Sequence, residues 1–216
     1  MSGPQHRTQA MRRETTRRKL LDATLQAMLE SGCARMTTAE VAERAGVSRG
    51  ALTHHFPSKD DLVATAVEYL LTGATREIRE QAARVDKGDL DLDGFVEHLW
   101  RLFSGPLFYL TLEHVTEARH NASLRAKMIP VVRRFHAALD AIWREFFCQT
   151  SLTSMEVDTT LNMTLCLLRG MGVQTVLRDD PVYYRRLLEG WKAHLCHLTE
   201  ANQDKRAPGY AAGTER

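Results

Sequence analysis

The side chains best suited to chemistry gather in one segment, residues 37–59, with one arginine ahead of it. Hydroxyls at the starts of helices can bind phosphate together with free backbone amides. Arginine, threonine and histidine on a helix can contact the edges of bases in a major groove, and lysine can neutralise a phosphate. These residue types point to an anionic polymer rather than to catalysis. The candidate contact residues are Arg17, Thr37, Thr38, Ser48, Arg49, Gly50, Thr53, His54, His55 and Lys59.

The sequence offers few other groups that could do chemistry. It contains no glycine-rich phosphate loop, no G-x-S-x-G and no H-E-x-x-H. His194 and His197 share a helix face, but packing or surface exposure explains them more simply than a metal does. The cysteines form no CxxC and indicate a reducing cytoplasm; they are Cys33, Cys148, Cys166 and Cys196. We expect no catalytic residue, no metal and no cofactor.

Charge is distributed unevenly along the 216 residues. Residues 1–60 hold ten lysines and arginines against six acidic residues, an excess of four positive charges, so the remainder of this +2 chain carries −2. A basic N-terminal block on a near-neutral body predicts an anionic partner for that block alone. No run of apolar residues is long enough for a membrane span, and residues 1–19 lack the apolar stretch of a secretory signal. The sequence therefore predicts a cytoplasmic protein without a membrane partner.

Two short helices must position the candidate contact residues. Thr37 and Glu40 have the spacing of a capping box for the first helix. Gly46 supplies a turn and Ser48 caps a second helix over 49–55, which Pro57 ends. This pattern predicts a helix-turn-helix whose second helix projects its polar residues outward.

Helical periodicity dominates the rest of the chain, and the fold class is all-α with about nine helices. Expected features include a kink or break at Pro130, a capping box formed by Thr153 and Glu156, and a helix start with Asp180 as its cap and Pro181 as its first residue. The predicted division is a basic arm and helix-turn-helix domain over 1–57, a helical ligand-binding and dimerisation domain over 58–200, and a tail over 201–216. The tail is polar and is expected to be disordered.

The segment from about Arg17 to Leu71 resembles the TetR family of bacterial transcriptional regulators, through TTAEVAERAGVSRGALTHHFPSKDDLV at residues 37–63. Lys59 matches the family's usual phosphate contact. Thr53 departs from the pattern, because the family usually has a tyrosine there that reaches a phosphate or a base edge; we expect the shorter Thr53 to meet a thymine methyl or a nearby phosphate. The matching positions are Thr38, Ala42, Ala45, Gly46, Val47, Ser48, Gly50, Leu52, His55, Phe56, Ser58, Lys59 and Leu62.

The resemblance implies an all-α homodimer. In this family the first three helices bind DNA, and the fourth links them to a larger helical body that often binds a small molecule. The last two helices usually form a four-helix bundle across the dimer axis.

A small-molecule site is expected between helices spanning about residues 95–177. Large apolar groups with a few polar ones suit a lipophilic or aromatic ligand that carries a cationic or hydrogen-bonding head. A closed core with solvated glutamates is the alternative. The candidate lining residues are Phe103, Phe108, Tyr109, Glu113, Glu117, His120, Phe135 and Met163.

The sequence as a whole predicts a dimeric, sequence-specific regulator of transcription that binds a palindromic double-stranded operator. A repressor released by a small molecule is the leading form. An activator, or a regulator without such an inducer, is the main alternative. A helical interaction module without a specific operator and an all-helical enzyme are more distant ones.

Overall fold

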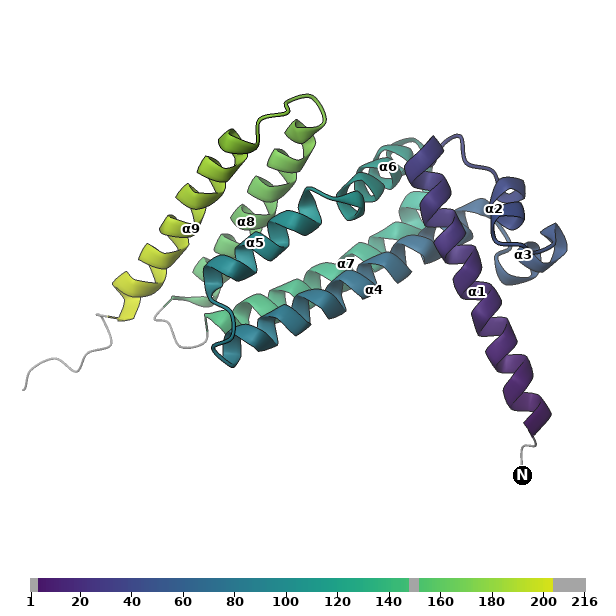
Figure 1. Cartoon of the computed structure of the whole chain (residues 1–216), viewed down its shortest axis with the longest axis horizontal. Helices are drawn as coiled ribbons and strands as arrows, with labels where there is room; N and C mark the ends of the chain where they lie inside the picture. Colours follow the sequence, from purple (N-terminus) through teal and green to yellow (C-terminus); the bar gives the residue numbers. More distant parts are fainter. Residues whose placement is uncertain (1–3, 148–151, 204–216) are drawn as a thin grey trace, which may run out of the picture. The chain divides into compact units, whose positions relative to one another are not determined.

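The computed structural model describes residues 4–147 and 152–203 of the chain, and in these residues it contains nine α-helices and no strand (Figure 1). The predicted all-α fold class is confirmed. The helices are α1 (Pro4–Ser31), α2 (Thr38–Arg44), α3 (Arg49–His55), α4 (Lys59–Asp86), α5 (Leu92–Phe103), α6 (Pro106–His120), α7 (Ala122–Phe146), α8 (Ser154–Thr175) and α9 (Pro181–Gln203). No described helix has the length and apolar character needed to cross a membrane.

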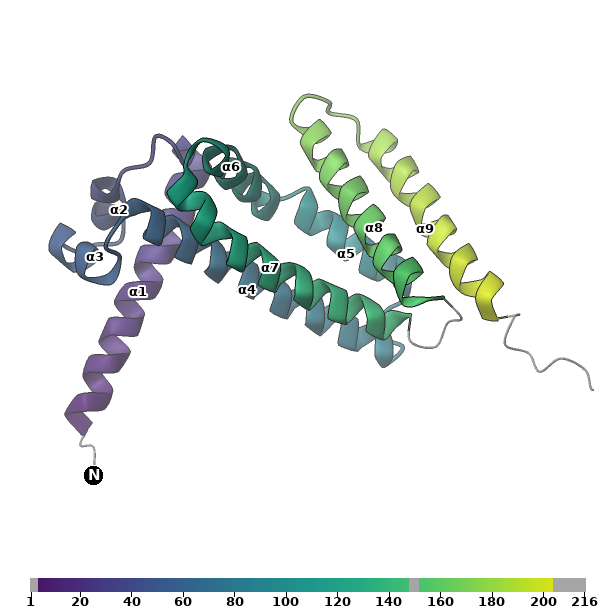
Figure 2. The same cartoon turned by 180° about the vertical axis from the view of Figure 1, so that it is seen from behind.

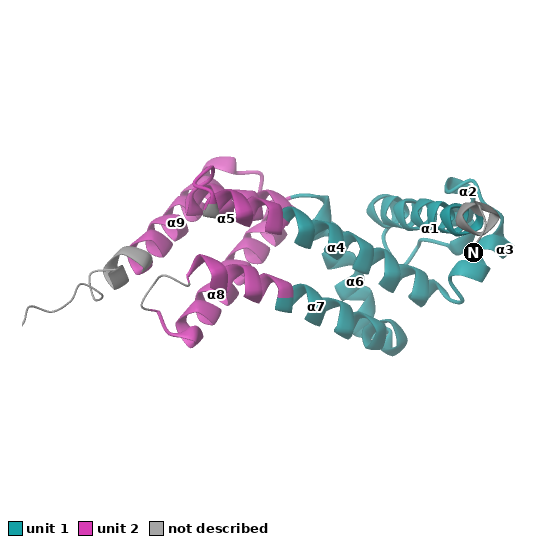
Figure 3. Ribbon diagram, turned by 90° about the horizontal axis from the view of Figure 1, so that it is seen from below, with its two compact units in different colours: residues 1–77, 105–137 teal, residues 78–104, 138–216 magenta. Residues whose placement is uncertain are grey.

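The chain forms two compact units (Figure 3). Unit 1 comprises residues 1–77 and 105–137, and unit 2 comprises residues 78–104 and 138–216. Helices α4 and α7 contribute residues to both units, and unit 1 groups α6 with the helix-turn-helix. This grouping differs from the expected division at residue 57. That division separates a DNA-binding part from a ligand-binding and dimerisation part, and it stays a prediction.

The basic N-terminal segment is helical rather than an extended arm. Helix α1 begins at Pro4 and contains no further proline or glycine before it ends at Ser31. The hydroxyls of Thr15 and Thr16 donate to the carbonyls four residues earlier, as threonines in a continuous helix can. Gly32 has a φ of +80° and ends the helix. Basic residues 12–19 are therefore carried on the first half of α1.

Helix α7 continues through Pro130, so of the predicted kink or break, the break does not occur. Proline removes one helical hydrogen bond, which is least costly where water can reach the orphaned carbonyl. Pro130 and Ala126, whose carbonyl loses that partner, are both exposed. Within unit 1 three side-chain contacts tie α7 and its preceding turn to α4: Asn121 to Asp60 at 3.0 Å, and the ion pairs Lys127–Asp61 and Arg134–Glu68.

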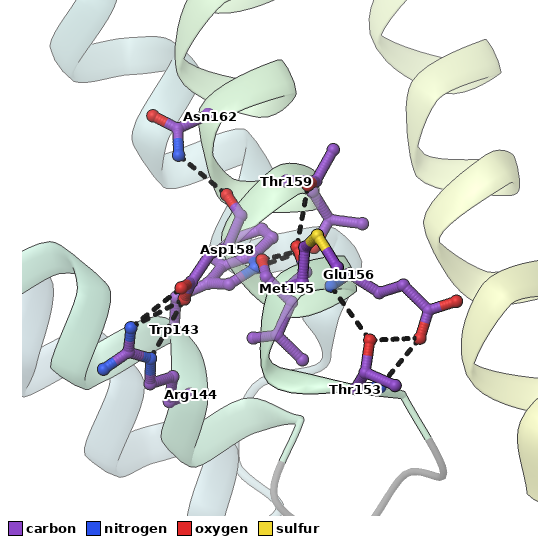
Figure 4. A network of polar contacts seen from close by, with 10 residues as sticks. Trp143, Arg144, Thr153, Met155, Glu156, Asp158, Thr159 and Asn162 are labelled. Atoms are coloured by element: carbon purple, nitrogen blue, oxygen red, sulfur yellow. Dashed lines mark hydrogen bonds and ion pairs between the residues drawn. The ribbon is translucent and has the colours of Figure 1, made fainter.

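The start of α8 is fixed by polar contacts within unit 2 (Figure 4). Thr153 and Glu156 form the predicted reciprocal capping box, and Arg144 of α7 forms an ion pair with Asp158. Deeper in the unit, the indole of Trp143 donates to the hydroxyl of Thr160 at 3.1 Å. This last bond is buried and satisfies two polar groups in the core of unit 2.

Helices α8 and α9 lie side by side in both views (Figures 1 and 2). Asp180 accepts from the amide of Tyr183 at 2.9 Å, so the predicted cap of α9 is confirmed. Val173, Val176 and Val182 are 49%, 57% and 62% exposed. Helix α9 extends to Gln203, so the predicted disorder is wrong for 201–203, and residues 204–216 lie outside the described residues.

Candidate nucleic-acid interface

The turn between α2 and α3 has the geometry that the sequence predicts. Gly46 adopts a φ of +67°, and its amide donates to the carbonyl of Glu43 at 3.0 Å. The next amide, that of Val47, donates to the carbonyl of Ala42 at 2.9 Å. These two bonds make a Schellman motif, in which a left-handed residue closes the helix and reverses the chain. Val41 and Leu52 are buried on the two sides of the turn.

Two hydroxyls cap the short helices. Thr37 Oγ1 accepts from the amide of Glu40 at 3.2 Å, and Ser48 Oγ accepts from the amide of Ala51 at 3.2 Å. Both predicted caps are confirmed. Only half of the predicted capping box forms in α2, since the Glu40 carboxylate accepts from Arg44 at 3.5 Å instead of from the amide of Thr37.

The outer face of α3 is polar and open to solvent. Arg49, Gly50, Thr53 and His54 are exposed, whereas Leu52 faces the core. The Thr53 hydroxyl donates to the carbonyl of Arg49 at 3.0 Å, so on this exposed residue the methyl group and an oxygen lone pair remain available for other contacts. A methyl and an acceptor suit contact with a thymine or a base amino group.

The basic face of α1 meets the end of α3. The guanidinium of Arg17 lies 5.2 Å from the ring centre of Phe56, the residue that caps α3. Burial lowers the pKa of His55, and the nearby charges of Arg13, His54 and Arg17 lower it further. Positive charge from α1 is thus concentrated beside the C-terminal end of α3, where it favours binding of phosphate.

The remaining candidate contacts lie at the starts of α2 and α4. Thr38, the first residue of α2, is half-buried. Lys59 opens α4, and its Nζ donates to the carbonyl of Ala34 at 3.0 Å, in the turn between α1 and α2. All ten predicted DNA-contact residues therefore belong to one unit, and their DNA contacts stay predictions.

The eight predicted lining residues are divided between the units. Phe108, Tyr109, Glu113, Glu117, His120 and Phe135 belong to unit 1, and Phe103 and Met163 belong to unit 2. Phe103, Phe108 and Phe135 are buried, and His120 is exposed. Glu113 turns its carboxylate to the amide of Cys33 at 3.2 Å. Their role in binding a small molecule stays a prediction.

Two hollows are described in unit 2. An open groove of about 530 Å³ on α8 is lined by Met155, Asp158, Thr159, Asn162, Met163 and Cys166. A cavity of about 290 Å³ lies between α5 and the α8–α9 turn, with Trp100 and Tyr184 on its wall and their ring centres 5.9 Å apart. Of the predicted lining residues, Met163 lines the groove and none lines the cavity.

Sequence reasoning missed two features of unit 1. Arg44 of α2 forms a bidentate pair with Glu30 of α1, at 2.7 and 2.6 Å. His114 of α6 is 2% exposed; its Nδ1 donates to the carbonyl of Leu110 at 2.9 Å, and burial lowers its pKa. Neither has a local sequence signal, because each depends on packing between helices.

The sequence and the fold of this chain match those of known proteins. The family model described as bacterial regulatory proteins, tetR family, matches residues 20–66, which contain the whole helix-turn-helix. The chain is 30% identical over 173 residues to the HTH-type transcriptional regulator BetI of Burkholderia mallei, covering 79% of this chain and 86% of that protein. The chain belongs to the TetR family. It is thus a TetR-family transcriptional regulator with a DNA-binding helix-turn-helix.

Other transcriptional regulators match over most of their length. The HTH-type transcriptional regulator CymR of Pseudomonas putida is 28% identical over 184 residues, covering 85% of this chain and 91% of CymR. The crystal structure of the transcriptional regulator FadR from Bacillus subtilis, in complex with stearoyl-CoA, matches with a TM-score of 0.60 at 19% identity. That match covers 84% of this chain and 96% of FadR, and it extends the similarity of fold far beyond the helix-turn-helix.

Proposed function

We propose that this TetR-family regulator is a homodimeric repressor that leaves a palindromic operator when a small molecule binds. The observation that carries the proposal is the exposed polar face of α3, set by the Gly46 turn beside the basic half of α1. Residues 1–57 would bind DNA, and residues 58–200 would bind the effector and the second copy. Such a protein acts on DNA in the bacterial cytoplasm.

The proposed DNA contacts are of two kinds. Arg49, Thr53 and His54 point away from the core on α3 and would contact bases, with Gly50 allowing close approach. The remaining candidates, at helix starts or on the basic face beside α3, would position the protein on the phosphates. These are Arg17, Thr37, Thr38, Ser48, His55 and Lys59. In the dimer, two copies of α3 would lie about 34–36 Å apart, one turn of DNA.

An exposed stripe on α8 supports the proposed dimer. Its members alternate at spacings of four and three, the pattern of a helix that packs along another helix. Met163, Val173 and Leu177 are 48%, 49% and 95% exposed, and a Cβ at Gly170 would meet open space. Val182 adds an exposed apolar group at the start of α9. Such a surface fits burial against a second copy. The stripe comprises Thr159, Met163, Cys166, Gly170 and Val173 of α8 and continues to Leu177, two residues beyond the end of the helix.

Two observations support the proposal that a small molecule binds this protein. FadR, which shares the fold, was solved with stearoyl-CoA bound. In this chain the predicted lining set combines buried rings with a few polar groups, which suits a lipophilic or aromatic molecule with a polar head. A ligand that binds the DNA-free state more tightly than the DNA-bound state would release the operator.

Footprinting on the DNA upstream of the protein's own gene tests the proposal. We expect a symmetric protected site that random DNA does not compete for, and a dimer in sedimentation. Transcription of a reporter driven by that site should fall when the protein is present. Protection of a single half-site by a monomer would contradict the dimer, and a rise in transcription would contradict repression.

A further inference from the structure

The turn between α1 and α2 sets the direction in which the helix-turn-helix leaves α1. Gly32 opens it with a φ of +80°, its amide donates to the carbonyl of Met28 at 3.0 Å, and its carbonyl accepts from Met36 at 3.1 Å. Cys33 and Met36 in this turn are each 1% exposed. Because the turn is short and two of its side chains are buried, a small shift in it would change the orientation of α2 and α3 relative to α1.

A carboxylate from α6 forms a hydrogen bond with this turn. Glu113 Oε2 accepts from the amide of Cys33 at 3.2 Å, a bond between residues 80 positions apart in the sequence. The contact is close, since a Cβ added at Gly32 would lie 3.0 Å from the same oxygen. Helices α1 and α6 also pack against each other in unit 1. Glycine at position 32 thus allows both the backbone conformation and the approach of the carboxylate.

A second bond holds the same turn from α4. Lys59 Nζ donates to the carbonyl of Ala34 at 3.0 Å, one residue beyond the amide that Glu113 binds. The turn is therefore held by an anion from α6 and a cation from α4, each bonded to a neighbouring backbone group. Hydrogen bonds to charged groups are stronger than those between neutral groups.

We infer that Glu113 is a positioning residue for operator binding: its bond to the Cys33 amide fixes the α1–α2 turn and joins α6 to the helix-turn-helix. The inference rests on the proposed function, in which a ligand beside α6 weakens operator binding. A movement of α6 would pull on the turn through this bond and reorient α3. This route runs through the α1–α2 turn.

Two substitutions at position 113 and a matched control test the inference. Glu113→Ala removes the acceptor and should weaken operator binding about ten-fold. Glu113→Gln keeps an acceptor oxygen and should remain within about three-fold of the wild type. Thr116→Ala shortens an exposed side chain on the same helix, one turn away, without removing the bond to Cys33, and should bind as the wild type does. Affinities are measured by fluorescence anisotropy at fixed salt, with melting temperature and sedimentation confirming folded dimer.

Hydrogen exchange at the Cys33 amide supplies a readout that a purely stabilising contact would not change. Because coupling is reciprocal, saturating operator should slow exchange of this amide in the wild type. The same operator should have little effect on it in Glu113→Ala.

Three outcomes would overturn the inference: unchanged affinity in Glu113→Ala, an equal loss in Thr116→Ala, or an affinity loss that matches the unfolded fraction. If the wild type itself binds no operator, the proposed function fails first, and the inference fails with it.

Discussion

Replacing Gly46 by alanine isolates the energetic contribution of the turn between α2 and α3. Gly46 has a φ of +67°, and a Cβ added there would meet no atom within 4 Å. The substitution therefore adds no steric clash, and its cost is the left-handed backbone alone, about 1–2 kcal/mol. For a chain of this size that corresponds to a fall in melting temperature of roughly 2–8 °C.

Two companion variants test the reasoning. Gly46→Asn should recover part of the loss, because asparagine tolerates the left-handed region better than alanine does. Gly73→Ala is the matched control: Gly73 lies within α4, and its added Cβ would also meet open space. It should stabilise the protein by up to about 1 kcal/mol, since alanine favours helix over glycine.

Urea unfolding followed by circular dichroism at one fixed protein concentration measures all three variants. A dimer's apparent stability depends on concentration, so the concentration must be equal throughout. If Gly46→Ala and Gly73→Ala changed the unfolding free energy in the same direction, left-handed strain at Gly46 would not be the cause.

Three further predictions follow from the contacts described above. Arg49→Ala should lose about 1–3 kcal/mol of discrimination between the operator and a mutated operator. Lys59→Ala should weaken binding to both DNAs equally and reduce the slope of log affinity against log salt concentration by about one. Titrations at several salt concentrations would show the reverse pattern if the roles of the two residues were exchanged. Burial lowers the pKa of His114 below its usual 6.5, so the unfolded chain binds the proton first. The stability this gives is complete above about pH 6.5 and is lost as pH falls, and His114→Asn should flatten that dependence in urea titrations at different pH values. Leu177→Glu should dissociate the dimer in sedimentation, whereas Val115→Glu, at another exposed apolar site, should not.

Local interactions are the part of this fold that the sequence predicts well. Thr37, Ser48 and Asp180 cap helices as expected, because each bonds an amide three residues away. Gly46 closes its helix for an equally local reason, the backbone conformation it alone adopts easily. The helix-turn-helix could therefore be predicted almost in full before its structure was known.

Contacts between distant segments account for the failures. The bond from Glu113 to Cys33 joins residues 80 positions apart, and no spacing rule relates them. Helical periodicity identifies the apolar positions of α8 but does not say which of them are buried within one chain, and Val173 is exposed. Pro130 did not break α7, because its position on an exposed face of the helix removes much of the cost.

The positions of the tryptophans give this protein a built-in optical label. All three, Trp100, Trp143 and Trp191, belong to unit 2, so indole emission reports on that unit alone. Circular dichroism, in contrast, reports on the helices of both units. Coincident unfolding curves from the two signals would mean that α4 and α7, which carry the backbone from one unit into the other, make the chain melt as a single cooperative body.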